Sequence, residues 1–467
     1  MLCPRVVDIC PFVHLSAEGS FFMYFTDQLE ENMAWLNQAL HVDKNFDVVY
    51  RVLTIADKKA CLYFIDGFTK DDSLLKILQG FSSIKADDMP EDAHSFSKKY
   101  LPYGEIGLLS DSREMIIQLL SGVSCLFIDG YNKCLTIDCR TYPSRSIEEP
   151  DKDKSLRGSR DGFVETIVFN TALMRRRIRD PHLIMEMYEA GTSTRTDVAL
   201  CYMSDRVDRE LLTTIQNKLE ESKSQDLKMS QQSLAESLFQ RKWYNPFPKY
   251  KFTERPDTAC ACLMEGKVIL LTDTSPSALI LPTSIFDMIE EANDYYFPPI
   301  TGIYLKISRV LISLLTVFMV PLFLLFMQNP AWIPEIFRFV LIEDTVNIPL
   351  IFQILILELA IDGLLNTPSM LSTPLSVIAG IVMGEFSVES GWFNSEIMLY
   401  MAFVSIANYT QPNFELGYAL KFMRLLLLIL TAIFNLPGFL TGCLIVVLCI
   451  TFNKTLSGRS YLNVKLN

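Results

Sequence analysis

The stretch Ile307–Met327, which reads ISRVLISLLTVFMVPLFLLFM, decides the fold class of this chain. It carries a single charged residue, Arg309, and as a helix it is long enough to cross the hydrocarbon layer of a bilayer. Pro321 would kink this helix rather than break it, because neighbouring helices can satisfy the carbonyl that loses its donor. The stretch therefore predicts the first membrane-spanning helix of an integral membrane protein.

A second long apolar run, Leu425–Phe452, can be interpreted in two ways. It is interrupted by the Asn-Leu-Pro-Gly stretch that begins at Asn435, so it is either one long tilted helix or a tight helical hairpin. The positive-inside rule places basic flanks in the cytoplasm, and basic residues flank both ends of this run, which favours the hairpin. The flanking residues are Lys421, Arg424, Lys454 and Arg459.

Between these runs lie three shorter apolar segments, Pro349–Leu365, Pro374–Ser387 and Ile397–Ala407. Lys306 and Arg309 place the start of the first span on the cytoplasmic side. Met1–Ser20 has no basic start leading into a continuous apolar stretch, so we expect no signal peptide and a cytoplasmic N-terminal half. The chain is then expected to cross the membrane an even number of times, four or six. With four crossings, some of the short segments would enter and leave the membrane on the same side.

The residues before Gly302 form a polar, acidic half. The chain has a formal net charge of −12, and nearly all of it lies in this half. Such a surface repels polynucleotides, so we expect no nucleic-acid partner. Short β-branched and aromatic runs alternate here with helical periodicity, which predicts two α/β units.

The first unit is expected to contain strands at Asp47–Ile55 and Lys59–Asp66, helices at Ser73–Ile84 and Arg113–Leu120, and a hairpin at Ser124–Asp129 and Lys133–Asp138. The second is expected to contain a helix at Gly162–Arg179, a strand at Asp197–Met203, a helix at Asp208–Glu221, a hairpin through Glu265-Gly266, a strand at Ala278–Leu281 and a helix running into Asp294-Tyr295-Tyr296. Phe64-Ile65-Asp66-Gly67 recurs as Phe127-Ile128-Asp129-Gly130, which is either shared turn chemistry or a duplication.

The predicted fold class is therefore an α/β soluble N-terminal half with two α/β subdomains, followed by an all-α polytopic membrane domain of four to six segments. The expected parts are an N-terminal extension (1–40), subdomain 1 (41–142), a linker (143–156), subdomain 2 (157–300) and a helical transmembrane domain (301–467).

Signals for catalysis and for cofactors are missing from the sequence. It contains no P-loop, no dinucleotide-binding glycine motif, no nucleophile elbow and no metal-spaced pair among its four histidines. The eleven cysteines are scattered, several of them in apolar runs, which is typical of reduced, buried thiols. Cys260 and Cys262 form only a C-x-C, which is a weak zinc signal. We expect no enzyme, no cofactor and no metal site.

Carboxylates inside the apolar segments are the candidate ion pathway: Glu358, Asp362, Glu385 and Glu389. An ionised acid is costly in hydrocarbon, so it normally faces a cavity, a partner or water. The members of each pair are four residues apart and share a helix face, so a symmetric oligomer would align them as rings that favour cations. The alternative is that these helices end at the interface, where the acids are hydrated. Gly380 and Gly384 form a G-x-x-x-G, which permits close helix packing.

Arg157–Asp180 reads RGSRDGFVETIVFNTALMRRRIRD. It closely resembles the signature of the A subunits of GerA-type spore germinant receptors, in which an Arg-Gly-x-Arg-Asp-Gly-Phe-x-Glu opening leads through a helix to a cluster of arginines. The resemblance continues at Val268–Pro282 and at Phe414–Arg424 (FELGYALKFMR). Within that family, Lys59–Lys76 looks most like the branch called stage V sporulation protein AF. One departure is Asp273-Thr274-Ser275, which stands where receptor A subunits tend to have an Asp-Gly turn.

The signature residues are expected to be structural, and they are Arg157, Arg160, Asp161, Gly162, Glu165, Arg175, Arg176 and Arg177. Asp161 can cap the amides at the start of the helix, and Glu165 can pair with Arg160 or Arg157. The arginine cluster is interpreted first as the solvated end of a helix and second as a docking site.

The resemblance implies a protein of the spore inner membrane whose soluble half faces the spore core. Its partners would be the lipid bilayer, further copies of itself and other germination membrane subunits. A subunits are thought to oligomerise into an ion-conducting pore, and the AF branch implies a role in ion or dipicolinate release. The alternative is a non-conducting scaffold that holds partner subunits and uses its acidic helices only for packing.

Overall fold

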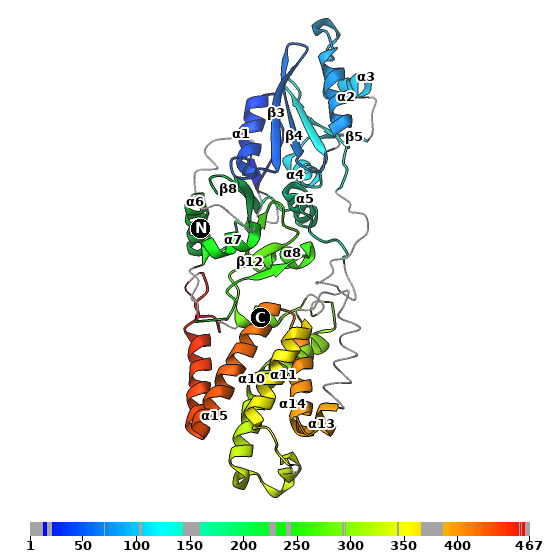
Figure 1. Cartoon of the computed structure of the whole chain (residues 1–467). Helices are drawn as coiled ribbons and strands as arrows, with labels where there is room; N and C mark the ends of the chain where they lie inside the picture. The colour runs from blue at the N-terminus through cyan, green and yellow to red at the C-terminus, as the bar shows by residue number, and fades with distance from the viewer. Residues whose placement is uncertain are drawn as a thin grey trace. The chain divides into compact units, whose positions relative to one another are not determined.

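The computed structural model of this protein describes residues 13–15, 21–69, 71–101, 105–142, 159–223, 230–239, 244–291, 294, 296–342, 345–365, 386–456, 458 and 460–462. The chain divides into two compact units. The N-terminal unit comprises Met1–Gln240 and Phe252–Pro282, and the helical unit comprises Arg241–Lys251 and Thr283–Asn467. Figure 1 shows the sheets of the first unit and the long helices of the second.

The first half of the N-terminal unit is a five-stranded sheet with helices on both faces. After β1 (Val13–Leu15) and β2 (Phe21–Met23), its elements are α1 (Leu29–Ala39), β3 (Val48–Ile55), β4 (Lys58–Ile65), α2 (Asp71–Ser82), η1 (Ala86–Asp88), α3 (Ala93–Tyr100), β5 (Ile106–Leu109), α4 (Ser112–Leu120), β6 (Ser124–Ile128) and β7 (Cys134–Ile137). The strand order is β3-β4-β6-β7-β5, with antiparallel pairs.

Alternation along β4 shows how the layers form. Cys61 and Tyr63 pack with α1 and α4, whereas Ala60 and Leu62 pack with α2 and α3. Successive side chains of a strand point to opposite faces, so a strand covered on both faces must be apolar throughout. This is why β4 and β6 read as nearly continuous apolar runs.

The second half of the N-terminal unit repeats the first half element by element. Its elements are α5 (Ile167–Arg177), β8 (Leu183–Ala190), β9 (Thr196–Met203), α6 (Arg209–Ser222), α7 (Ser230–Leu238), β10 (Lys251–Thr253), α8 (Pro256–Met264), β11 (Val268–Thr272) and β12 (Ala278–Leu281). Its sheet has the order β10-β12-β11-β9-β8. Read from the opposite edge, β8-β9-β11-β12-β10, this is the same order of equivalent strands as β3-β4-β6-β7-β5 in the first sheet. Helices α5 and α8 pack on one face, as α1 and α4 do in the first half.

The two predicted α/β units are therefore confirmed as two antiparallel sheets with helices. The Phe-Ile-Asp-Gly repeat is shared turn chemistry, because Gly67 and Gly130 both have positive φ, 79° and 85°. The hairpin predicted through Glu265-Gly266 is wrong. Gly266, with φ 85°, ends α8 and turns the chain into β11, which is the usual role of a glycine after a helix. The predicted linker Pro143–Lys154 lies outside the described residues.

The helical unit is built around α10 (Pro299–Gln328), which contains the whole of Ile307–Met327 and continues through Pro321 as predicted. Helix α10 packs against α14 and α15, and α11 packs against α14. The other elements of this unit are α9 (Ile285–Ile289), η3 (Pro330–Trp332), η4 (Glu335–Val340), α11 (Leu350–Leu365), α13 (Ser387–Glu389), α14 (Ser395–Tyr409) and α15 (Phe414–Thr451).

Helix α15 is a hairpin, as its basic flanks and its Asn-Leu-Pro-Gly stretch predicted. Its backbone leaves the helical region at Asn435, where φ is 52° and ψ is −133°. A Cβ placed on Gly442 would lie 3.1 Å from Leu427 Cγ, whereas a straight helix would separate these residues by about 22 Å. The two arms therefore run back along each other, and Asn435 forms the tip.

The predicted number of membrane segments needs correction. In the described part of the chain, two helices are long and apolar enough to cross a membrane, α10 and α15, not four to six. Helices α11 and α14 have 16 and 15 residues and are shorter than these two. Most of Pro374–Ser387 lies outside the described residues.

Candidate functional site

Four charged side chains meet inside the helical unit, two from α11 and two from the first arm of α15. Arg424 donates through Nε to Glu358 Oε1 at 2.8 Å, and its Nη2 lies 2.6 Å from the same oxygen. Lys421 Nζ lies 3.4 Å from Glu358 Oε2 and forms an ion pair with Asp362. The acids are spaced i, i+4 and the bases i, i+3, so each helix presents its pair on one face.

This buried charge cluster is electrically balanced. Glu358, Lys421 and Arg424 are each at most 4% exposed, and the side chain of Asp362, at the edge of the cluster, is 34% exposed. Buried charges destabilise a fold unless each is paired, and here two carboxylates face two cations. The sequence around Glu358 offers only Asp362 as a polar neighbour, whereas the fold supplies Arg424 and Lys421. In this arrangement protein donors occupy the oxygens of Glu358.

Helix α10 extends the cluster with polar groups on its buried face. Arg424 Nη1 donates to the Thr316 carbonyl at 3.2 Å. Nearer the start of α10, Ser313 donates to the Arg309 carbonyl and accepts from Gln411 Nε2 at 3.0 Å. Arg309, Ser313 and Thr316 are all buried, and their i, i+4, i+7 spacing makes a polar stripe on an otherwise apolar helix. We call this stripe together with the buried charge cluster the polar seam.

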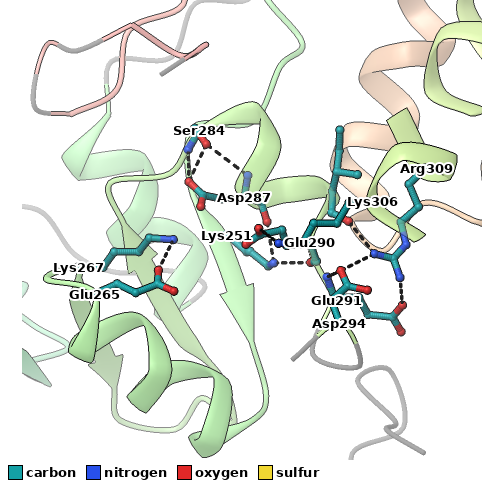
Figure 2. Close-up of polar contacts among 11 residues, drawn as sticks. Lys251, Glu265, Lys267, Ser284, Asp287, Glu290, Glu291, Asp294, Lys306 and Arg309 are labelled. Atoms are coloured by element: carbon teal, nitrogen blue, oxygen red, sulfur yellow. Dashed lines mark hydrogen bonds and ion pairs between the residues drawn. The ribbon is translucent and has the colours of Figure 1, made fainter. Parts of the chain in front are cut away.

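An acidic segment before α10 holds the start of the polar seam. Arg309 lies 2.6 Å from Asp294 and 2.9 Å from Glu291 (Figure 2). Lys306 lies 2.5 Å from Glu290. The two basic residues that the sequence assigned to the cytoplasmic flank of the first span are therefore neutralised by the segment that precedes the helix.

The short helix α9 in this segment is itself fixed at both ends. Ser284 and Asp287 form a capping box, in which each side chain accepts from the backbone N–H of the other residue (Figure 2). Lys251 Nζ donates to the carbonyls of Asp287 and Glu290, both at 2.7 Å. These hydrogen bonds fix the segment from which Glu290, Glu291 and Asp294 pair with α10.

Three buried oxygens near the polar seam have no donor in the described part of the chain: Asp294 Oδ1, Asn408 Oδ1 and Gln411 Oε1. The Gln411 amide has a defined orientation, because Ser313 donates to a carbonyl and must accept from Gln411 Nε2. A buried acceptor without a donor destabilises the fold by about 1–3 kcal/mol, so these oxygens favour binding of water or a cation.

Glu389, another predicted pathway residue, is not part of this cluster. Glu389 is exposed in α13. Glu385, Gly380 and Gly384 lie outside the described residues, as does Arg157 of the signature. Of the four candidate pathway carboxylates, the structure therefore brings together Glu358 and Asp362.

The signature helix begins later than its sequence indicates. Helix α5 starts at Ile167 rather than at Gly162, which is buried in the segment before it. Asp161 therefore does not cap α5, and that prediction is wrong. Its carboxylate accepts from Ser159 at 2.9 Å and lies 3.6 Å from Arg177. Arg160 and Glu165 are both exposed, and no ion pair joins them among the described residues.

A residue far along the chain caps α5 instead. The Ile167 N–H donates to Asp273 Oδ1 at 3.1 Å. Asn170 makes a reciprocal pair with Val164, accepting from its N–H at 2.8 Å and donating to its carbonyl at 2.6 Å. We call this set of hydrogen bonds the helix clamp. The helix clamp accounts for the Glu-Thr-Ile-x-x-Asn run of the signature, because its hydrogen bonds fix the start of α5.

The first half of the N-terminal unit has the same helix clamp at α1. The Leu29 N–H donates to Asp129 Oδ1 at 3.2 Å. Asn32 pairs reciprocally with Thr26, at 3.1 and 2.8 Å. The repeated Leu/Ile-x-x-Asn spacing was visible in the sequence, and together with the Asp at a strand end it was the signal that could have revealed the duplication.

A third bond of the helix clamp spans the turn that supplies the Asp. The Gly130 N–H donates to the Asp27 carbonyl at 2.8 Å, and the Thr274 N–H donates to the Glu165 carbonyl at 2.7 Å. Gly130 has φ 85° and Thr274 has φ 63°. Glycine adopts this region freely, whereas threonine is strained there. Thr274, where the sequence departs from the family pattern, thus keeps the backbone of a glycine turn.

Arg175 contradicts the interpretation of the arginine cluster as a solvated helix end. Its side chain is fully buried, and it holds Asp47 through Nε at 2.7 Å and Nη2 at 3.0 Å, while Nη1 donates to the Leu183 carbonyl at 3.1 Å. Asp47 directly precedes β3, so this bidentate pair joins the two halves of the N-terminal unit. Arg176 and Arg177 are exposed, as the solvated interpretation predicted.

The C-x-C cysteines are buried, free thiols of α8. Burial raises the pKa of Cys260 to about 12, although nearby Arg177 acts in the opposite direction. Metal binding and nucleophilic attack both need the thiolate. At neutral pH Cys260 therefore serves as a small core side chain.

Comparison with known proteins places these features in a family. The family model described as Bacillus/Clostridium GerA spore germination protein matches residues 34–466. The chain is 33% identical to stage V sporulation protein AF of Bacillus subtilis (strain 168), over 91% of this chain and 87% of that protein. It is 24% identical to spore germination protein KA of the same organism, over 86% of this chain and 75% of that protein.

Among solved structures, the chain is similar to the N-terminal domain of the A subunit of the Bacillus megaterium spore germinant receptor GerK3. The identity is 24% and the TM-score is 0.43, with 55% of this chain and 95% of that chain covered. The match of the family model over nearly the whole chain shows that this protein belongs to the GerA family of spore germination proteins.

Proposed function

We propose that this protein is a membrane subunit of a spore germination complex, and that copies of it assemble into a channel that conducts ions or dipicolinate during germination. Membership of the GerA family and the identity to stage V sporulation protein AF support a role in germination. The proposal that the protein conducts ions rests on the polar seam. Charged and polar groups inside apolar membrane helices are costly to bury, and they commonly mark ion pathways.

The same proposal places the protein in the spore inner membrane with its N-terminal unit facing the spore core. Helices α10 and α15 are long enough to cross a bilayer. Lys306 and Arg309 at the start of α10 lie where the positive-inside rule expects the inner side. Other germination membrane subunits would be its partners.

One observation favours a second candidate, a non-conducting scaffold. Glu358 is fully paired within a single chain, so it does not offer a free carboxylate to a passing cation. A conducting state must therefore open the contact between Glu358 and Arg424. A scaffold needs no such change and uses the buried charge cluster to lock α10, α11 and α15 together.

Ion flux through liposomes that contain the purified protein separates the two candidates. Glu358→Gln alone would leave Lys421 and Arg424 with one carboxylate, so the better variant is Glu358→Gln with Arg424→Gln, which removes one charge of each sign. A channel predicts that this variant inserts and conducts with an altered rate or cation preference. A scaffold predicts no flux above that of empty liposomes for the natural protein.

The matched control is Glu335→Gln with Arg338→Gln. This pair has the same residue types and the same charge change, but its side chains are 87% and 67% exposed. It should leave flux unchanged. Equal flux in the natural protein, the cluster variant and the control would show that α11 does not line the path.

A further inference from the structure

A cavity of about 550 Å³ lies in the helical unit beside the last turns of α15, apart from the polar seam. One hydrogen bond joins two of its lining residues: Asn245 Nδ2 donates to the Cys449 carbonyl at 3.2 Å. The lining residues are Tyr244, Asn245, Lys249, Leu448, Cys449, Phe452 and Lys454.

The lining of this cavity combines two kinds of chemistry. Lys249 and Lys454 supply positive charge, although the chain as a whole carries a net charge of −12. Leu448 and Phe452 supply apolar surface, and they are 40% and 70% exposed. A ligand that matches both the positive charge and the apolar surface must carry an anionic group and an apolar chain next to each other.

The position of the cavity along the helices identifies such a ligand. The tip of the α15 hairpin lies at the far end of α10, because Asn329 Nδ2 donates to Asn435 Oδ1 at 2.7 Å. The second arm of α15 runs from this tip to the cavity. In a bilayer that surrounds α10 and α15, the cavity then lies at the level of the lipid headgroups, where lysines and tyrosines are enriched.

We propose that this cavity binds an anionic phospholipid, with its phosphate held by Lys249 and Lys454 and an acyl chain lying on Leu448 and Phe452. Juxtamembrane basic residues attract anionic lipids in this way. The inference rests on the proposed placement of the helical unit in the membrane, but it is independent of ion conduction. Detergent extraction and reconstitution of the protein test the placement separately from lipid binding.

The experiment measures which lipid the purified full chain retains. Nanodiscs are made with phosphatidylcholine and phosphatidylglycerol in equal amounts, and the lipid bound to the protein is identified by native mass spectrometry after gentle release. We expect retention of phosphatidylglycerol. Lys249→Gln with Lys454→Gln should weaken this retention about thirty-fold, because each basic residue contributes about fivefold. Phe452→Ala should weaken it as well, since it removes apolar wall without changing charge.

The matched control is Lys98→Gln with Lys133→Gln, two exposed lysines of the N-terminal unit. This control should retain phosphatidylglycerol like the natural protein. An equal loss in the control and the cavity variant, or no preference for phosphatidylglycerol over phosphatidylcholine, would overturn the proposal. Inorganic phosphate that competes fully with the lipid, combined with no effect of Phe452→Ala, would instead assign the cavity to small anions and also overturn it.

Discussion

Thr274 holds a backbone conformation that glycine holds at the equivalent turn of the first helix clamp. Its φ of 63° brings its Cβ close to neighbouring backbone atoms, a strain that glycine does not have. We predict that Thr274→Gly raises the free energy of unfolding of the N-terminal unit by about 1 kcal/mol. Urea denaturation of the purified protein, followed by hydrogen exchange in β11 and β12, measures this change.

The reciprocal substitution provides the control for this prediction. A Cβ on Gly130 would meet only the flexible end of Lys58, at 3.2 Å, so space is not limiting there. Gly130→Thr should therefore lower the free energy of unfolding only through the backbone strain of a positive φ. The decrease should be similar in size to the increase expected for Thr274→Gly. If both substitutions were neutral, left-handed strain would not be the feature that distinguishes the two turns.

The Asp47–Arg175 pair is a buried ionic contact between the two halves of the N-terminal unit. Asp47→Ala leaves a fully buried guanidinium without its carboxylate, so we predict a loss of about 3–5 kcal/mol of stability. Asp47→Ala combined with Arg175→Met should recover much of this loss. Arg176→Ala, at an exposed position, should cost less than about 0.5 kcal/mol. Thermal unfolding of the detergent-solubilised protein compares the three variants.

At the scale of elements, the hairpin of α15 depends on a close approach at Gly438. A Cβ there would overlap the carbonyl oxygen of Leu430. Alanine normally stabilises a helix relative to glycine, so a loss at this position can be attributed to the packing of the two arms. We predict that Gly438→Ala prevents the tip from closing and strongly lowers the yield of monodisperse protein in detergent, measured by size-exclusion chromatography.

Gly363 in α11 is the matched control, because a Cβ there meets no heavy atom within 4 Å. Gly363→Ala should leave the yield and the thermal midpoint unchanged or slightly higher. An equal loss in both variants would attribute the effect to alanine in an apolar helix rather than to the hairpin.

Elements defined by local signals could be predicted from the sequence, and elements defined by distant contacts could not. The reversal at Asn435 has a local cause, the turn residues and the basic flanks, so the hairpin prediction was confirmed. The start of α5 has a distant cause. Asp273, which caps Ile167, lies 106 residues along the chain, so the acidic residues of the signature were the nearest available caps and gave the wrong start.

The same distinction holds for the candidate site. The spacing of Glu358 and Asp362 predicted a shared helix face, and the structure places them together. The sequence could not show that Lys421 and Arg424 present a complementary face, because this depends on how α11 packs against α15. The duplication of the N-terminal unit was hidden for a similar reason. Its two halves share only a few residues of the helix clamp, such as Asn32 and Asn170, whereas Asp27 and Gly130 of one half stand where Glu165 and Thr274 stand in the other.

At the scale of the whole molecule, the helical unit predicts how the chain lies across a membrane. Helix α10 begins beside the acidic segment and ends at Asn329, next to the hairpin tip at Asn435. The second arm of α15 returns to Cys449, whose carbonyl accepts from Asn245. The tip therefore lies at one end of the unit, and the residues that enter and leave the unit lie at the other.

We predict from this arrangement that a reporter fused after Asn467 lies on the same side of the membrane as one fused before Met1. A cysteine introduced at Arg338, an exposed position of η4 in the connection that follows α10, should be labelled only from the opposite side in a background without the native cysteines. The comparison uses a membrane-impermeant maleimide on sealed vesicles of known orientation. A C-terminal reporter on the side of Arg338 would mean that α15 crosses the bilayer once, in an open form, and that the hairpin is not its arrangement in the membrane.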